Sequence, residues 1–308
     1  VSRWDLGPEA APPARPLHHY AEWNRPAGRE IAALGKPITK AALSPDGRAL
    51  AYDGDQGALG VLDASTGAVR WEVAQPSFAA QSGRNRWITF SADGARVLLS
   101  ARDRGWGAQE AVVRAFDAAT GALLDTVHPG TLGPIVARGG ILALGGLHPV
   151  LLDPASLATR APIDALDTEV TALSIHPSRD LLIVGGSGGE TAIASATTGA
   201  PLALFLAAGG ADFISTTPEG AFVASTDGAR ALAWTFTAPL EGYAFDQFAT
   251  VYDRPEAVRR RLAGAPPDLA APLLRPPRLT LAGATPASVA ERALHLHADV
   301  RSQGRVDA

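Results

Sequence analysis

The sequence predicts an all-β fold built from repeated four-stranded antiparallel units. The first observation is internal repetition, since "ITKAALSPDGRALAYDGDQGALGVLDASTGAVRWEV" (38–73) realigns with "RWITFSADGARVLLSARDRGWGAQEAVVRAFDAATGALLDTV" (86–127). The second is the recurrence of Asp-Gly turn signals between apolar runs in both copies. The third is composition: 32 Gly and 24 Pro among 308 residues indicate many turns between short elements.

Each copy contains four apolar runs separated by S-x-D-G, a polar gap and D-A-x-T-G. The pairs Asp46–Gly47 and Asp93–Gly94 predict tight two-residue hairpins, because glycine tolerates the positive φ that these turns need. The stretches 63–67 and 117–121 close the next hairpin in the same way. Alternation along these runs favours strands over helices, so each copy is expected to be a four-stranded meander.

Three weaker copies follow, at residues 132–163, 170–206 and 211–236, the last with T-P-E-G in place of S-P-D-G. Units of this kind cannot bury both sheet faces alone, so we expect them to stack radially as the blades of a β-propeller. The period of about 40–45 residues agrees with that architecture. The dipeptide Trp4–Asp5 is interpreted as the end of another blade, so the chain is expected to begin partway through a repeat.

The S-P-D-G-R turn, the D-x-x-T-G turn and Trp4–Asp5 resemble WD40-repeat proteins of bacteria over residues 1–240. The last copy, followed by "FDQFATVYDRPEAVRRRLAG" and "PPRLTLAG", resembles the terminal blade and tail of bacterial WD40 proteins that are often joined to a caspase-like peptidase domain. This resemblance implies that the T-P-E-G blade closes the propeller, a short helix follows, and an Ig-like module comes next. The expected domains are propeller blades (1–240), a short helix with a Pro-rich linker (241–277) and the start of an Ig-like β module (278–308).

Local physics predicts the same short helix. Asp253 can cap it, Pro255 lies in its first turn, Val258 and Leu262 face inward, and Gly264 ends it.

The composition of the chain disfavours several classes of partner and active site. A formal net charge of −4 disfavours nucleic acid as a partner. With no cysteine, the chain has no disulfide, no thiolate zinc site and no caspase-type active site of its own. No signal peptide or membrane span is visible, which favours the cytoplasm, and no cofactor motif is present.

Two motifs invite a chemical interpretation but favour a simpler one. Ser187 in "GGSGG" fits the nucleophile pattern G-x-S-x-G, yet its context predicts strand, turn and strand with no helix following. His295 and His297 share one face of a strand, but no third ligand accompanies them, so a surface location is favoured over a zinc site.

The candidate partner-binding residues form two groups. Trp106 is expected on an exposed loop beside Arg102 and Arg104, where an aromatic side chain can anchor a partner. Arg259, Arg260 and Arg261 lie on the short helix next to Glu256, as a solvated face with local ion pairing or as a docking patch. The other tryptophans, at 23, 71, 87 and 234, are expected to pack between blades.

The preferred function is a non-catalytic interaction or sensing propeller. Its expected partners are proteins, and the resemblance implies a caspase-like peptidase domain that it regulates in cis or in trans. Two alternatives stay open: an enzyme with carboxylates such as Asp103 and Glu110 at the channel mouth, and a structural spacer.

Overall fold

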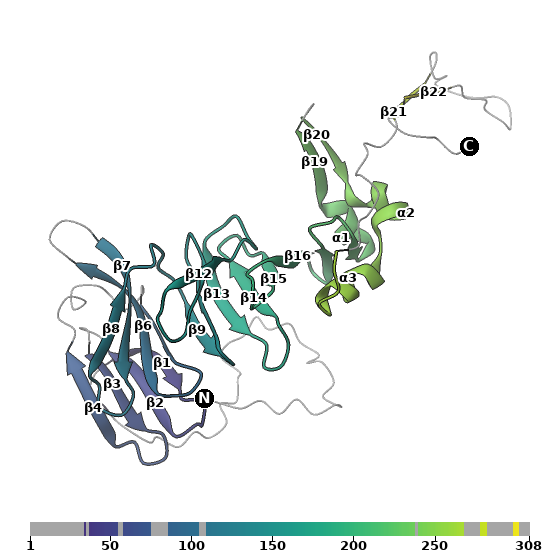
Figure 1. Cartoon of the computed structure of the whole chain (residues 1–308). Helices are drawn as coiled ribbons and strands as arrows, with labels where there is room; N and C mark the ends of the chain where they lie inside the picture. Colours follow the sequence, from purple (N-terminus) through teal and green to yellow (C-terminus); the bar gives the residue numbers. More distant parts are fainter. Residues whose placement is uncertain are drawn as a thin grey trace.

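The computed structural model describes residues 34, 37–54, 58–74, 86–104, 109–237, 240–267, 278–281 and 298–301. Within the described residues, four antiparallel sheets of four or more strands follow one another along the chain (Figure 1), and two two-stranded sheets come after them. In each of these four sheets the strands pair in chain order, as the meander prediction requires. The all-β, propeller-type prediction is therefore confirmed.

The strands of the first three blades have the following bounds. The first blade contains β1 (Ile38–Leu43), β2 (Ala49–Gly54), β3 (Ala58–Asp63) and β4 (Val69–Ala74). The second contains β5 (Trp87–Phe90), β6 (Arg96–Arg104), β7 (Gln109–Asp117) and β8 (Leu123–Val127). The third contains β9 (Ile135–Arg138), β10 (Ile141–Leu144), β11 (Val150–Leu152) and β12 (Thr159–Pro162).

The fourth sheet has six strands. They are β13 (Val170–Ile175), β14 (Leu182–Gly186), β15 (Thr191–Ala194), β16 (Pro201–Gly209), β17 (Asp212–Thr216) and β18 (Phe222–Ala224). The first strands of successive blades are neighbours, β1 with β5, β5 with β9, and β9 with β13. These strands therefore form the inner edge of the blade stack.

Apolar side chains on both faces of a strand hold the blades together. On β6, Val97, Leu99 and Ala101 pack against the first blade, whereas Leu98 packs against the third. Successive side chains on a strand point to opposite faces. The apolar run that contains these residues is therefore a strand buried on both sides between two neighbours.

A buried ion pair also joins the first two blades. Arg86 Nε lies 3.0 Å from Asp53 Oδ2, and both side chains are 1% exposed. Arg86 also donates to the Gly54 carbonyl, and Thr39 Oγ1 donates to Asp53 Oδ2. Removing one partner would leave an uncompensated buried charge. The pair therefore holds the start of β5 next to β2.

The Asp-Gly hairpins are longer than the two-residue turns predicted. Ser44 N donates to the Ala49 carbonyl, which leaves four residues in the loop, and Gly47 has φ +74°. Ser44 Oγ donates to Asp46 Oδ1 at 2.6 Å, and the Ser91–Asp93 pair repeats this contact. The prediction failed because the serine hydroxyl and aspartate carboxylate together organise a wider turn.

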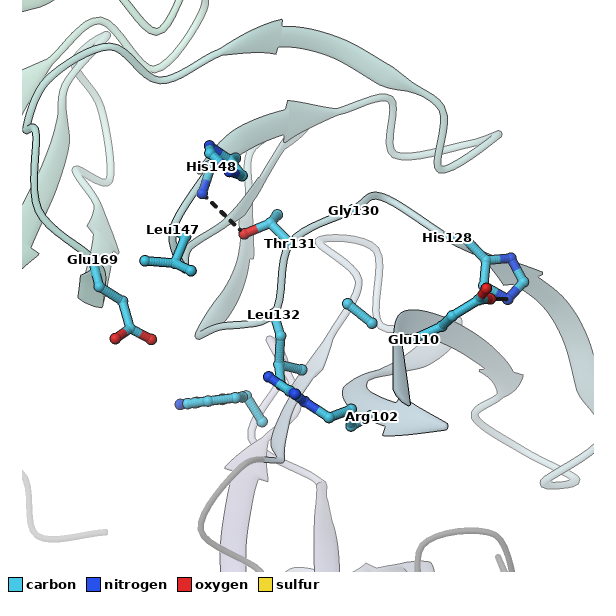
Figure 2. A pocket seen from close by; sticks show the side chains of 11 residues that line it. Arg102, Glu110, His128, Gly130, Thr131, Leu132, Leu147, His148 and Glu169 are labelled. Carbon is cyan, nitrogen blue, oxygen red and sulfur yellow. Dashed lines mark hydrogen bonds and ion pairs between the residues drawn. The ribbon is translucent and has the colours of Figure 1, made fainter. Parts of the chain in front are cut away.

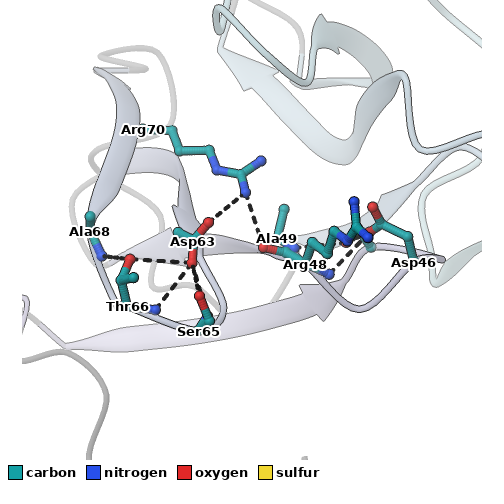
Figure 3. Close-up of polar contacts among 9 residues, drawn as sticks. Asp46, Arg48, Ala49, Asp63, Ser65, Thr66, Ala68 and Arg70 are labelled. Carbon is teal, nitrogen blue, oxygen red and sulfur yellow. Dashed lines mark hydrogen bonds and ion pairs between the residues drawn. The ribbon is translucent and has the colours of Figure 1, made fainter.

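The D-x-x-T-G turns are carboxylate-centred loops. Asp63 Oδ1 accepts hydrogen bonds from the backbone N–H groups and hydroxyls of Ser65 and Thr66, while Asp63 Oδ2 lies 2.8 Å from Arg70 (Figure 3). Asp117 and Asp153 make equivalent bonds in the second and third blades. The same network thus closes the outer hairpin of three blades.

In the fourth blade, the carboxylate that accepts hydrogen bonds in this turn comes from a different hairpin. Ser195 replaces the aspartate, and its hydroxyl donates to Asp180 Oδ2 at 2.7 Å. Asp180 Oδ1 also accepts from Thr197 N at 2.7 Å. In the repeat register, Asp180 stands where the first blade has Arg48, so the turn carboxylate has moved to the neighbouring hairpin.

The fifth copy does not form a separate blade, so that prediction was wrong. Its strands β17 and β18 pair onto β16 and extend the fourth sheet. The cause is a tight reversal after β16, where Gly209 and Gly210 have φ of +100° and +58°. The chain therefore returns along the same sheet instead of crossing to a new one.

A small helical region follows β18 (Figure 1). It comprises α1 (Thr226–Ala231), the hairpin β19 (Ala233–Thr237) and β20 (Leu240–Ala244), η5 (Phe245–Phe248), α2 (Ala249–Tyr252) and α3 (Pro255–Leu262). Helix α1 occupies the position of an expected strand, because Ser225 caps it by accepting from Gly228 N. Aromatic contacts such as Phe222 with Phe245 bind this region to the sheet.

The predicted short helix is confirmed as α3. Pro255 lies in its first turn, Val258 is buried, and Gly264 ends it with φ +88°. The expected cap was wrong, since Arg254 occupies the N-cap position without a side-chain cap. Asp253 instead forms an isolated bridge with Phe222.

The described part of the tail contributes one further pair of strands, β21 (Arg278–Leu281) and β22 (Ala298–Arg301). An Ig-like module at 278–308 and the domain limits stay predictions. Trp4–Asp5 lies outside the described residues. In the described part of the chain, no helix is long and apolar enough to cross a membrane.

The turn carboxylates predict acid sensitivity. The pKa of Asp63 is lowered, first by the Ser65 hydroxyl and then by Arg70 and two backbone N–H groups, and hydrogen bonds lower the pKa of Asp117 and Asp153 likewise. A lowered folded-state pKa gives stability that is present above the unfolded pKa of about 3.9 and lost as the pH falls below it. The urea midpoint should be constant from pH 7 to 5 and fall steeply below pH 4.

The control is the triple variant D63N, D117N and D153N. It should have a lower midpoint at pH 7 and a flatter dependence on pH below 4. An acid dependence as steep as that of the parent protein would contradict the assignment to these turns.

Candidate functional site

A pocket of about 610 Å³ opens where the inter-blade segments and the tip of a long hairpin meet. Its walls come from the second blade, from the second-to-third and third-to-fourth inter-blade segments, and from the β10–β11 turn. We call it the inter-blade pocket. Figure 2 shows the residues that line it.

The second blade contributes the end of an elongated hairpin. Strands β6 and β7 have nine residues each, whereas β10 has four, so their ends extend past the blade core. Arg102 and Glu110 line the pocket from these ends. Glu110 Oε2 lies 3.6 Å from His128 Nε2, with both side chains more than half exposed.

Trp87, at the start of β5, forms another part of the wall. Its ring lies 5.9 Å from Lys40 Nζ, within the range of a cation–π contact. It is half-buried and also packs against the apolar cluster between the second and third blades. The expectation of inter-blade packing is thus met in part, while the ring keeps a face on the pocket.

The third blade holds one exposed leucine in a rigid frame. Thr131, 4% exposed, donates from Oγ1 to the Gly145 carbonyl at 3.0 Å and accepts from His148 N. Gly146 has φ +107°, and a Cβ there would lie 2.4 Å from the Leu132 carbonyl oxygen. The β10–β11 turn is therefore fixed onto the inter-blade segment, and it presents Leu147 with 70% of its surface exposed.

Glu169, just before β13, supplies a second carboxylate to the pocket. Its carbonyl accepts from Ser187 N at 2.9 Å, which ties it to the β14–β15 turn. With neutral histidines, one arginine and two glutamates give the lining a formal charge of +1 − 2 = −1. The pocket thus combines an exposed apolar side chain with charged side chains of both signs.

Ser187 itself lies in a hairpin turn between β14 and β15, and no helix follows. The simpler interpretation of "GGSGG" is confirmed. Among the described residues, no group of three or more His, Cys, Asp or Glu side chains is placed to hold a metal ion. His295 and His297 lie outside the described residues, so their interpretation stays a prediction.

Arg102 and Arg104 of the first candidate group lie near the end of β6 in the second blade. Arg102 lines the inter-blade pocket, and Arg104 ends β6 opposite Gln109. Trp106 lies outside the described residues. Of this group, Arg102 is the residue that the structure places in the pocket wall, and the role of the group in binding stays a prediction.

The second group lies on α3, from which no residue lines the inter-blade pocket. Arg259 forms an ion pair with Glu256, as the default interpretation expected. Arg261 is only 17% exposed, lies 3.3 Å from Glu219 Oε1 and donates to the Pro201 carbonyl. Arg261 therefore ties α3 to the T-P-E-G turn, and the three arginines do not present one common face to a partner.

Two other tryptophans have clear structural roles. Trp71 is buried between the first and second blades, and its Nε1 donates to the Ala118 carbonyl at 2.9 Å, as predicted. Trp234 instead stacks on Phe245 with ring centroids 4.6 Å apart, in the region after the fourth blade. The inter-blade prediction was wrong for Trp234, because β19 does not belong to a blade.

Both carboxylates named for the enzyme alternative have side-chain partners. Asp103 lies 2.5 Å from Arg114, and Glu110 pairs with His128. Asp46 and Asp93 sit in hairpin turns, where the Ser44 and Ser91 hydroxyls lower the pKa of each carboxyl. Those two groups stay ionised and bound within their own turns, an environment opposite to the raised pKa of a general acid.

Sequence reasoning missed Thr131, Leu147 and Glu169. They belong to inter-blade segments and to a turn with no repeat motif, so no local pattern marked them. A signal did exist in "GGLHP" (145–149), where two glycines precede an apolar residue before a proline that ends the turn.

No protein-family model matches the chain, and no curated protein matches it by sequence. Among solved structures it is similar to the C-terminal WD40 domain of Sif2, with 14% identity, a TM-score of 0.44, and coverage of 64% of this chain and 56% of that one. It is also similar to the β-propeller domain of Myceliophteria thermophila Cps50 (Swd1), at 17% identity and a TM-score of 0.44, covering 61% and 64%.

A third similar structure is BamB from Moraxella catarrhalis, at 17% identity and a TM-score of 0.37, covering 64% of this chain and 73% of that one. The chain thus spans 56% and 64% of the length of the first two structures. The assignment of propeller blades rests on the strand pairing of the chain itself.

The hydrogen bonds that hold the turn around Leu147 predict that substitution of Thr131 lowers the free energy of unfolding. Replacing Thr131 with Val keeps the shape but leaves the Gly145 carbonyl and His148 N–H without their partner, which should cost about 1–2 kcal/mol of unfolding free energy. Urea denaturation measures this cost. Thr131→Ser, which keeps the hydroxyl, should lose much less, and equal losses in both variants would contradict the hydrogen-bonding role.

Proposed function

We propose that this chain is a non-catalytic propeller that binds a protein partner through the inter-blade pocket. The observation that carries the proposal is Leu147, which is 70% exposed although a buried threonine and a glycine turn hold its backbone rigidly. An apolar side chain held in this way loses little entropy on binding, so it is suited to be an anchor.

The surroundings of Leu147 support the same proposal. Trp87 provides an aromatic surface, and Arg102 and Glu169 provide charges of both signs within one pocket. Binding hot spots combine buried aromatic or arginine anchors with a polar rim that excludes water. A rigid scaffold with functional loops at one end is also the usual way in which propellers present such surfaces.

The test places a photo-crosslinking amino acid at position 147 of the protein produced in its native cells. We expect a discrete crosslinked protein with the probe at 147 and none with the probe at 240, because Leu240 is 79% exposed but lies on β20. In purified form, Leu147→Asp should weaken binding of the identified partner at least tenfold, whereas Leu240→Asp should leave it unchanged.

Absence of a crosslink at 147, or unchanged binding of the crosslinked partner by Leu147→Asp, would overturn the proposal. That outcome would favour the structural-spacer alternative. Unfolding midpoints of both aspartate variants serve as the folding control, since both side chains are exposed in the parent protein.

For the partner class, we propose a caspase-like peptidase domain, in cis or in trans. The support is the resemblance of residues 211–283 to the terminal blade and tail of proteins that carry such domains. Regulation would require the bound state to favour one arrangement of the peptidase over another. Adding the purified propeller to a caspase-like domain from the same source should change its peptidase rate, and Leu147→Asp should reduce the change; an unaltered rate would refute this partner.

A further inference from the structure

Four Asp-Gly pairs occur in the sequence, beginning at Asp46, Asp53, Asp93 and Asp227, and all lie within the described residues. Such a pair can rearrange without an enzyme, because glycine has no side chain to hinder its nitrogen. That nitrogen attacks the side-chain carboxyl carbon of the aspartate, water leaves, and a five-membered succinimide forms. Water then opens the ring at either carbonyl, which gives aspartate or isoaspartate, so the net change is an isomerisation that needs no other reactant.

The S-x-D-G turn restrains both reacting groups at two of the four pairs. Ser44 Oγ and Arg48 N donate to Asp46 Oδ1. The attacking nitrogen, that of Gly47, donates to the Ser44 carbonyl at 2.9 Å. The Ser44 hydroxyl also lowers the pKa of Asp46, and an ionised carboxylate loses its oxygen less readily than the neutral acid. The turn at Asp93 repeats these contacts, so both pairs are protected in the folded chain.

Burial and an ion pair restrain the third Asp-Gly pair. Asp53 is 1% exposed, and its carboxylate contacts Arg86 Nε and the Thr39 hydroxyl. Gly54 is the last residue of β2, and its carbonyl accepts from Arg86. Ring closure at this pair would therefore require the loss of the buried ion pair between the first two blades.

The carboxylate of the fourth pair is far less restrained. The side chain of Asp227 is 75% exposed, and its one side-chain partner among the described residues is Arg230, 3.6 Å away. Arg230 also lies 3.5 Å from Asp246, so the two carboxylates share one cation. Because exposed ion pairs are weak, the carboxyl group of Asp227 is open to attack.

The backbone at the fourth pair is also weakly held. Gly228 N donates to Ser225 Oγ at 3.2 Å, but the same oxygen accepts from Phe213 N. The pair lies in the first turn of α1, which has only six residues, and so short a helix depends on its tertiary contacts. A Cβ at position 228 would clash with the Phe213 carbonyl oxygen, so the packing of α1 requires the residue that reacts most easily.

We propose that Asp227–Gly228 is the pair at which the folded chain forms isoaspartate, while hydrogen bonds and burial preserve the other three pairs. Isoaspartate adds a methylene group to the main chain and shortens the side chain. Gly228 N then no longer reaches Ser225 Oγ, so α1 loses its N-cap. Ala229 of α1 belongs to the apolar cluster of Phe222, so the modification loosens the helical region after the fourth sheet.

The experiment incubates the folded full chain for several weeks at neutral pH. Peptide mapping with electron-transfer fragmentation, which distinguishes isoaspartate from aspartate, follows each pair. We expect isoaspartate at 227 to accumulate about fivefold faster than at 46 or 93, because hydrogen bonds to a charged group must break first at those two positions. In urea, where the turns are unfolded, the four pairs should react at comparable rates.

Three outcomes would overturn the proposal. The first is isoaspartate at Asp46, Asp53 or Asp93 of the folded chain as fast as at Asp227. The second is no isoaspartate at any of the four pairs. The third is a preference for Asp227 that persists in urea, because the local sequence and not the fold would then explain it.

Two variants test the chemistry at single positions. Ser44→Ala removes the hydroxyl that donates to Asp46 and should raise the rate there about fivefold, with Asp93 in the same molecule as the internal control. An unchanged rate at Asp46 would contradict the protective role of the turn. Asp227→Glu keeps the charge but cannot close a five-membered ring, so it should form no isomer at 227.

Urea denaturation measures the effect of the modification on stability. Incubated parent protein should have a lower unfolding midpoint than fresh protein, whereas incubated Asp227→Glu should keep its midpoint. Equal losses in both proteins would contradict the predicted loosening of α1. These measurements follow mass and stability alone, so their outcome is independent of partner binding at the inter-blade pocket.

Discussion

Burial of both faces of each sheet is the constraint on which the rest of this structure depends. A four-stranded meander has two faces, and its central strands here are apolar on both, as Val97 and Leu98 illustrate on β6. One blade alone would expose both of these faces to water, so the blades depend on their neighbours for stability. The sheets therefore stack in chain order, and their inner strands β1, β5, β9 and β13 align as a consequence.

The stacked sheets do not require the connecting segments to share one sequence or conformation. The turns at Asp63, Asp117 and Asp153 make nearly the same hydrogen bonds in three blades, because one carboxylate satisfies several backbone N–H groups at once. The third turn does so although its sequence is D-P-A-S-L, with Leu157 in the glycine position. The segments between blades have no hydrogen-bonding motif in common, and they line part of the inter-blade pocket. Hydrogen bonds such as the one from Thr131 to the Gly145 carbonyl hold these irregular segments in place.

In the fourth sheet, a tight turn determines which sheet the following strand joins. Gly209 and Gly210 reverse the chain directly, so β17 continues the existing sheet. The helical region that follows packs on this extended sheet, and Arg261 fixes α3 to it through Glu219. As a result, β19 and the T-P-E-G turn lie beside the inter-blade segment that carries Asp164.

The sequence by itself determined the all-β class, the repeat, the turn residues and the short helix at Pro255, because these depend on alternation and on local hydrogen bonding. It also marked Arg102 as a candidate, since charges beside a glycine-rich loop are visible along the chain. Only the tertiary structure decided that Asp180 serves the turn of Ser195, that β17 joins β16, and that Leu147 and Glu169 line one pocket. Those relations join residues from different hairpins and blades, and the packing of sheets, which no local pattern encodes, sets the distance between them.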